Sequence, residues 1–396
     1  MPTIHCPRNC KFLTGFAFAL ALALAAGGTG AAPYIPTDDD IVLDRIPTTL
    51  RLLSRDRIAT AASDRTRADM LETHLNLARR YIKAERDQGD PRYIGYALAA
   101  LEPWSKRARS PVKVLMLRAV LRQRRHDFSG ALADLRRVIA ARPRHAQAHL
   151  TRAFILQATG RPRKALESCL RLPRSLPKLV VATCRARMES LVGESARAES
   201  RLDRALVSDR QAPPGTRAWA LTIHGEIARI RGDITTALER LESALAVDNR
   251  DAYRRDAYAD LLMDAGRPVE VQQLLKAEPS TDGHLLRRAI AANDVTLTAQ
   301  LRRRLTSAQQ RGDRPHLREA ARLALHHGNQ AGRALELALE NWRYQREPWD
   351  ARLVLESALA ARKLHTASPV IAWMNQTGIE DRRLHTLLTM IKALEK

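Results

Sequence analysis

The chain is poor in aromatic residues, in cysteine and in the short motifs that mark common enzymes. Only 4% of its 396 residues are Phe, Trp or Tyr, and four are Cys. Beyond residue 31 there is no glycine-rich phosphate loop, nucleophile-elbow serine, zinc-protease histidine pair or close cysteine pair. These absences disfavour an enzyme, and we expect neither a cofactor nor a small-molecule substrate.

Acidic residues are scarce relative to basic ones. The 66 Lys and Arg residues exceed the 43 Asp and Glu residues and give a formal net charge of +23. Such a charge raises a polyanion as a possible partner. The arginines alternate with Glu and Asp along the chain instead of forming a block, which disfavours a nucleic-acid site.

The most apolar stretch of the chain lies near its N-terminus. Arg8 and Lys11 precede an apolar stretch over residues 12–26, and small residues fill positions 27–32. This order is typical of a secretory signal peptide, and the stretch is short for a membrane span. We predict a signal peptide over residues 1–31, cleaved near Ala31. No cysteine follows the stretch where a lipoprotein anchor would need one, so we expect a periplasmic protein with no membrane span after processing.

Helix-forming residues dominate the remainder. Residues 32–62 begin with Pro33 and Pro36, which predict an extended lead-in before a first helix. From Arg65 onward, apolar residues recur at helical spacing between short breaks that contain glycine. The whole chain is therefore predicted to be all-α.

The helical pattern repeats with a period of about 34 residues, within the range of proteins built from stacked helix pairs. In the clearest unit, which runs from Val112 to Pro143, Ala131 lies on the second helix. Ala165 and then Ala198 follow it at nearly equal intervals, and two further units carry Ala237 and Val271 at the equivalent position. The first helix of each unit also has a small residue at a fixed position: Ala119, Ala153, Ala186, Gly225 and Ala259.

This period and these small residues resemble the tetratricopeptide repeat, which has a small residue at position 8 and Ala at position 20. The resemblance implies a right-handed α-solenoid of antiparallel helix pairs, a superhelix whose concave groove binds a protein or peptide. It covers residues 112–278 as five units. A degenerate N-terminal pair is expected over 63–111 and degenerate C-terminal pairs over 279–396. The chain as a whole is similar to exported repeat proteins of Gram-negative bacteria.

The resemblance also indicates which side chains face the groove, since positions 2, 5, 9 and 12 of each first helix line it. The candidate partner groove contains Arg187, Trp219, Arg229, Tyr253, Asp256, Asp260 and Asp264. Further positions on the same face are Lys113, Met116, Val120, Gln123, Gln147, Leu150, Phe154, Gln157, Thr222, Glu226 and Met263.

The three aspartates form an acidic stripe, because they lie four residues apart on one helix. One interpretation is that the stripe holds Lys or Arg side chains of a bound peptide, with Trp219 and Tyr253 as aromatic anchors. The other is a solvated face with a local salt bridge, for which Arg229 is the candidate partner.

Cys169 and Cys184 are the two cysteines expected in the exported chain. They fall on the second helix of one unit and the first helix of the next, which pack together in this architecture. An oxidising compartment would favour a disulfide between them. The alternative is two small buried side chains that never meet.

A metal site is not expected. His145 and His149 have the spacing of two ligands on one helix, but no third ligand is evident near them. A packed or solvated histidine pair is the favoured interpretation.

Two functions remain after these considerations. The first is a non-enzymatic periplasmic scaffold that binds an envelope protein or peptide in the groove. The second is a basic protein that binds a polyanion such as lipopolysaccharide, acidic polysaccharide or nucleic acid.

Overall fold

The computed structural model describes residues 66–88, 92–106, 109–249, 251–276, 281–310, 317–327 and 330–395. All of them belong to one unit, Arg65–Lys396. The predicted signal peptide (1–31) and lead-in (32–62) lie outside the described residues.

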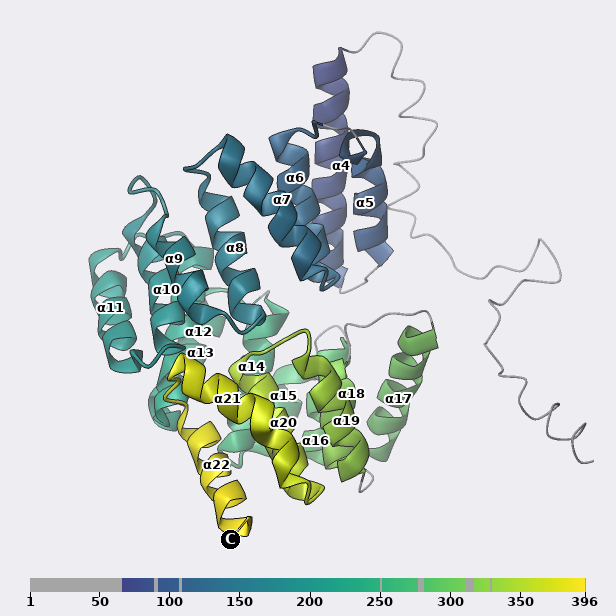
Figure 1. Cartoon of the computed structure of the whole chain (residues 1–396), viewed down its shortest axis with the longest axis vertical. Helices are drawn as coiled ribbons and strands as arrows, with labels where there is room; N and C mark the ends of the chain where they lie inside the picture. Colours follow the sequence, from purple (N-terminus) through teal and green to yellow (C-terminus); the bar gives the residue numbers. More distant parts are fainter. Residues whose placement is uncertain are drawn as a thin grey trace, which may run out of the picture. The chain divides into compact units, whose positions relative to one another are not determined.

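Within these ranges the chain forms 19 α-helices and one short 3-10 helix (Figure 1). Their bounds are α4 Arg67–Gln88, α5 Arg92–Ser105, α6 Val112–Arg124, α7 Phe128–Ala141, α8 Ala146–Ala158, α9 Pro162–Leu170, α10 Lys178–Ser190, α11 Ser195–Ser208, α12 Pro214–Arg231, α13 Ile234–Val247, α14 Ala252–Asp264, α15 Pro268–Leu275, α16 Asp282–Ala292, α17 Val295–Gln310, α18 Leu317–His326, α19 Ala331–Trp342, α20 Pro348–Ala360, η1 Leu364–Ala367, α21 Ser368–Thr377 and α22 Arg382–Leu394.

The helices form pairs that stack on one another, as the all-α solenoid prediction required. Each first helix packs on the second helix of its own pair, and that second helix also packs on the first helix of the next pair. The small residues of the repeat lie where the helices of a pair cross. Ala131, Ala165, Ala198, Ala237 and Val271 are all fully buried. At the crossing of α12 and α13, a Cβ added to Gly225 would be 2.9 Å from Leu241 Cγ and 3.0 Å from the Ala237 carbonyl oxygen. The crossing therefore leaves no room for a larger side chain.

Glycine ends the first helix of several pairs. Gly160, Gly193 and Gly232 have φ values of +74°, +86° and +81°, in the left-handed region that glycine adopts without strain. Helices α7 and α13 are the second helices of their pairs, and each begins with an aspartate cap. Asp127 accepts from the Gly130 N–H and Asp233 from the Thr236 N–H. These turns make the sharp reversal that each helix pair needs.

The same three glycine turns contact the C-terminal helices. A Cβ on Gly160 would be 2.8 Å from Arg346 Cβ, and one on Gly193 would be 2.7 Å from the Gly378 carbonyl oxygen. A Cβ on Gly232 would overlap Arg382. Helix α22 also contacts α12. The C-terminal part of the chain therefore packs back along the turns of three central pairs, a contact that no repeat pattern predicts.

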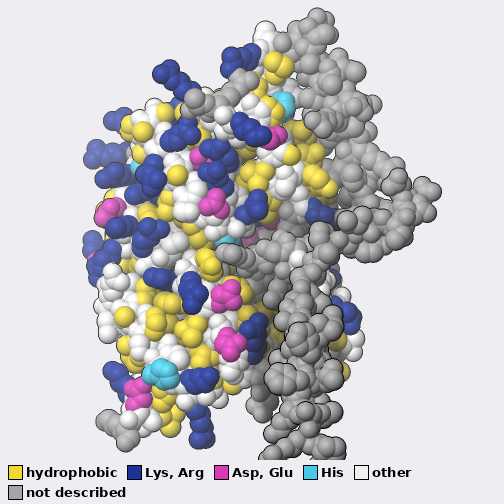
Figure 2. Space-filling model, turned by 45° about the vertical axis from the view of Figure 1, so that its right-hand side comes forward, with side chains coloured by type: hydrophobic (Ala, Val, Ile, Leu, Met, Phe, Trp, Pro, Cys, Tyr) yellow, Lys and Arg dark blue, Asp and Glu magenta, His cyan; other side chains and the backbone are white. Residues whose placement is uncertain are grey.

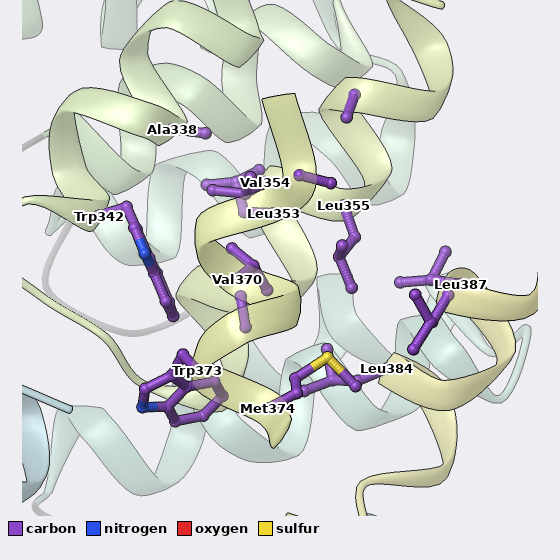
Figure 3. Close-up of a cluster of buried hydrophobic side chains, with 14 of the residues drawn as sticks. Ala338, Trp342, Leu353, Val354, Leu355, Val370, Trp373, Met374, Leu384 and Leu387 are labelled. Atoms are coloured by element: carbon purple, nitrogen blue, oxygen red, sulfur yellow. The ribbon is translucent and has the colours of Figure 1, made fainter. Parts of the chain in front are cut away.

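A hydrophobic cluster secures this contact. It is built mainly from α19 to α22 and includes Trp342, Trp373 and Met374 (Figure 3). The two tryptophan rings meet edge to face with centroids 5.4 Å apart. Leu191, which follows α10, and Ile230 of α12 join the same cluster from the central pairs. Apolar burial thus holds the C-terminal helices against the centre of the array.

Cys169 of α9 and Cys184 of α10 form a disulfide between neighbouring pairs, with their Cα atoms 5.7 Å apart. Both side chains are fully buried. No helix among the described residues is both long and apolar enough to cross a membrane.

The helix crossings predict a size limit that can be tested within α11. Ala198→Leu places three extra carbon atoms at a closed crossing and should lower the free energy of unfolding by about 1–3 kcal/mol. Ala196→Leu, on the exposed side of the same helix, should change it by less than about 0.5 kcal/mol. Urea unfolding followed by circular dichroism measures both. Equal effects of the two variants would show that the crossing does not limit side-chain size.

The disulfide predicts the behaviour of two peptides. Alkylation of the denatured protein without reductant should leave the peptides that carry Cys169 and Cys184 unlabelled and joined, as read by mass spectrometry. Reduction should lower the free energy of unfolding by about 3 kcal/mol, the loop-entropy value for a 15-residue separation. The double variant Cys169→Ser with Cys184→Ser serves as the control, because reductant should not change its stability. Label at both cysteines before reduction would contradict the bridge.

Candidate functional site

The inner faces of the first helices surround a cavity of about 640 Å³. Helices α6, α8, α10, α12 and α14 each contribute to its wall, and the connection between α19 and α20 closes one side. We call it the central cavity. Its lining includes these residues at the inner positions of the repeat: Val120, Gln123, Phe154, Gln157, Arg187, Trp219, Thr222, Glu226 and Tyr253.

One wall of the central cavity is aromatic and apolar. Phe154 of α8 and Trp219 of α12 meet at a ring-centroid distance of 6.0 Å, with an angle of 62° between the ring planes. Val120, Phe128 and Ile223 extend this wall. An apolar side chain placed here would lose water contact on several sides at once.

A second part of the lining, the polar wall, is a network of charged and polar groups, which includes residues of the same helices α8 and α12. Arg187 of α10 forms an ion pair with Glu226 of α12, and each side chain is only 6% exposed. The Tyr253 hydroxyl donates a hydrogen bond to Glu226. Gln157 accepts from Arg187 Nε at 3.3 Å and donates to Glu347 Oε1 at 2.8 Å. Because these groups satisfy one another, the wall can stay buried without a ligand.

The acidic stripe lies beside this cavity but pairs with the chain's own arginines. Asp260 accepts from Arg287 at 2.6 Å and from Arg322 at 2.8 Å, and its side chain is 5% exposed. Asp256 pairs with Arg287 at 3.2 Å. Asp264 of α14 forms two hydrogen bonds with Arg352 of α20, at 2.6 and 2.7 Å. The chain's own arginines therefore bind the carboxylates to which Lys or Arg side chains of a partner could otherwise have bound.

Arg229 does not neutralise the stripe, contrary to the sequence-based suggestion. It pairs with Asp381, the buried cap of α22, at 3.1 Å. Its guanidinium also lies 5.2 Å from the centre of the Trp349 ring. The same ring is approached by Arg322 at 5.8 Å and by Arg352 at 4.7 Å. Arg229 thus contributes to holding the C-terminal helices in place.

Sequence analysis missed the residues that the C-terminal helices bring to this face. They are Arg318, Arg322, Glu347, Trp349 and Arg352. The repeat spacing loosens after residue 278, so it does not show which way these side chains point. Their charged or aromatic residue types were the only indication in the sequence that they could belong to a site. Of the seven candidate groove residues, only Arg187, Trp219 and Tyr253 line the central cavity.

The histidine pair is engaged in local hydrogen bonds. His145 caps α8 by accepting from the Ala148 N–H, and His149 Nε2 is 2.8 Å from the Pro143 carbonyl oxygen. Among the described residues, no group of three or more His, Cys, Asp or Glu side chains is arranged to hold a metal ion.

Asp260 should make stability depend on pH. Burial alone would raise the pKa of this carboxyl, but the charges of Arg287 and Arg322 outweigh burial and lower the pKa to about 2. A carboxyl with a lowered folded-state pKa stabilises the fold above its unfolded pKa, near 3.8. This stabilisation, about 2 kcal/mol, is lost as the pH falls from about 5 to 2.

Replacing Asp260 with Asn should remove that part of the pH dependence. It should also lower the free energy of unfolding at pH 7 by about 3–5 kcal/mol, because two buried arginines lose their partner. Asp209→Asn is the control, as no ion pair to Asp209 exists within the described part of the chain. Urea unfolding between pH 7 and pH 3 measures both effects. Parallel pH curves for wild type and Asp260→Asn would refute this role.

No protein-family model and no curated protein matches the chain. Among solved structures, it is similar to a tetratricopeptide repeat protein from Parabacteroides merdae ATCC 43184, with 14% identity and a TM-score of 0.39 over 71% of this chain and 99% of that one. It is also similar to PilW, a type IV pilus biogenesis factor, with 16% identity and a TM-score of 0.36 over 71% of this chain and 100% of that one. A third likeness is to a Rap protein solved with Competence and Sporulation Factor, with 12% identity and a TM-score of 0.44 over 85% and 91% of the two chains.

Proposed function

We propose that the protein is a non-enzymatic scaffold of the cell envelope that holds a segment of another protein in the central cavity. The observation that carries this proposal is the pairing of an aromatic wall, Phe154 and Trp219, with a polar wall whose charges are already neutralised. A bound peptide would gain apolar contact at the first wall and hydrogen bonds at the second. It would not have to supply a charge.

The size and residue types of the cavity support this proposal. A volume of about 640 Å³ falls within the range of sites that enclose small ligands or a few side chains. Trp, Tyr and Arg are the residues that most often dominate binding energy at protein interfaces. Tyr253 is 52% exposed, so part of its ring is available to a partner.

A polyanion fits the central cavity poorly. Four carboxylates line the cavity, from Glu85, Glu226, Asp251 and Glu347, against three guanidiniums, from Arg124, Arg187 and Arg254. A chain of phosphates or uronates would meet repulsion there. On the face drawn in Figure 2, Lys and Arg side chains are spread out with hydrophobic side chains between them and form no single patch.

The envelope location remains part of the proposal. It is supported by the signal-peptide pattern of residues 1–31 and by the buried Cys169–Cys184 disulfide. Disulfides of this kind persist in oxidising compartments such as the periplasm.

Site-specific crosslinking in intact cells tests the proposal. A photoreactive amino acid at position 253 should give discrete adducts with a partner protein. The same amino acid at position 207 is the control, because Val207 is 64% exposed but lies outside the central cavity. Trp219→Ala in the position-253 chain should weaken binding by about 2 kcal/mol, or about thirtyfold, and so remove most of the adduct.

Circular dichroism must show that the Trp219→Ala chain is folded. Identical adducts from positions 253 and 207, or an adduct insensitive to Trp219→Ala in a folded chain, would argue against the cavity as the binding site.

A further inference from the structure

A second cavity, of about 530 Å³, lies where the turn between α8 and α9 meets the C-terminal helices. We call it the junction cavity. Its charged lining consists of Arg161, Arg343 and Arg346, and no carboxylate lines it. Trp373 and Gln376 of α21 complete the opposite side. The charged side chains that line the junction cavity are therefore all positive, whereas positive and negative side chains nearly balance around the central cavity.

None of the three guanidiniums forms an ion pair with a carboxylate in the part of the chain that the structure describes. Arg161 donates from Nε and NH2 to Thr159 Oγ1, at 3.1 and 2.9 Å. Arg346 donates from Nε to the Trp342 carbonyl oxygen at 3.0 Å. Elsewhere on the inner side of the array, arginines such as Arg187 and Arg318 pair with carboxylates. The three arginines of the junction cavity are exposed to solvent and are not neutralised in this way.

The Trp342 ring lies 5.9 Å from the Arg346 guanidinium, but no carboxylate among the lining residues offsets the mutual repulsion of the three arginines. Burial lowers the pKa of the Arg161 guanidinium, and the positive charges of Arg152 and Arg346 lower it further. Arg152 itself donates to the Ser168 hydroxyl and has no acidic partner among the described residues. An anion in the cavity would remove this repulsion and gain several charge-assisted hydrogen bonds.

Two hydrogen bonds fix segments that border the cavity. The Arg346 N–H donates to the Ala158 carbonyl oxygen at 2.8 Å, and Trp373 Nε1 donates to the Gly160 carbonyl oxygen at 3.2 Å. Both bonds join the end of α8 to segments that lie near the other end of the sequence. The fold thus brings Arg161 to Arg343 and Arg346, which lie three residues apart on one connection.

We propose that the junction cavity binds a phosphate monoester or pyrophosphate group between Arg161, Arg343 and Arg346. Three cations and no anion call for a ligand group with more than one negative charge. Guanidinium forks match the spacing of phosphate oxygens and bind them through paired hydrogen bonds. A single carboxylate would neutralise only one of the three charges.

The same phosphate chemistry can come from a free small molecule or from the headgroup of a membrane lipid. Two probes separate these sources. Sodium pyrophosphate represents the free group, and vesicles that contain phosphatidic acid represent a membrane-borne phosphate monoester. Vesicles with phosphatidylglycerol, a diester with a single charge, control for general attraction to an anionic surface.

The test compares two triple variants of the full chain that lose the same charge. The junction variant combines Arg161→Gln, Arg343→Gln and Arg346→Gln, and so removes all three cations from the lining of the junction cavity. The control variant combines Arg136→Gln, Arg171→Gln and Arg174→Gln, and so removes three exposed arginines that do not line the junction cavity. Pyrophosphate binding is measured by titration calorimetry at low salt, and vesicle binding by co-sedimentation.

We expect the junction variant to lose at least tenfold in affinity for the probe that binds, and the control variant to lose less than threefold. Pyrophosphate binding without vesicle binding assigns the site to a free phosphate. Binding to phosphatidic acid vesicles that the junction variant loses assigns it to a headgroup. Equal losses in both triple variants, or no binding of either probe by the wild type, would overturn the proposal.

Circular dichroism checks that the junction variant is folded. If it is not, the single variant Arg343→Gln replaces it, because the Arg343 side chain is exposed and bonds to no other described residue. That variant should lose at least threefold in affinity, and an unchanged affinity would contradict the site.

Discussion

The structure depends on the pairing of the buried charges that the C-terminal helices cover. When α18 to α22 pack against the first helices of the central pairs, they remove carboxylates and guanidiniums from water. A buried charge without a partner costs several kcal/mol. Asp260, Asp350 and Asp381 are each at most 5% exposed, and each is met by an arginine from another helix. The covering helices can pack only in the arrangement that makes these pairs.

Arginine suits this role better than lysine. Its flat guanidinium can serve two carboxylates or stack on an aromatic ring while it forms an ion pair. Arg352 does both, since it binds Asp264 with two hydrogen bonds, pairs with Glu356 and lies 4.7 Å from the centre of the Trp349 ring. Arg318 bonds to both Asp350 and Glu347. Many arginines are therefore paired inside the molecule, at surfaces that only folding brings together, while the formal net charge of +23 is unchanged by these pairs.

The features that sequence analysis predicted well are local ones. Repeating small residues mark the helix crossings because each unit meets the same steric limit, as Ala131 and Ala165 show. The inner positions follow from the helical period, which is why Phe154, Trp219 and Tyr253 could be assigned to one surface before the fold was known. That Cys169 and Cys184 lie close enough to bond also follows from the stacking of adjacent pairs.

The features that it could not predict involve residues far apart in the chain. Asp260 meets Arg322 of α18, and Gln157 of α8 meets Glu347 at the start of α20. No periodic sequence pattern encodes such contacts, because they depend on the rotation between neighbouring helix pairs, summed over many pairs. The sequence therefore left two interpretations of the acidic stripe, a surface for a partner or a solvated face with a local salt bridge, whereas arginines of the C-terminal helices pair with it. Gly160 and Gly232 belong to the glycine-containing breaks between helices that the sequence shows. The repeat pattern does not indicate that they also contact the C-terminal part of the chain.

The two cavities are joined by one short connection, residues 343–347, between α19 and α20. Gln345 and Glu347 line the central cavity, whereas Arg343 and Arg346 line the junction cavity. The backbone N–H of Arg346 bonds to Ala158 at the end of α8, so this connection is anchored to the central pairs. Both cavities therefore depend on the same five residues, whose path is fixed by the anchor on α8.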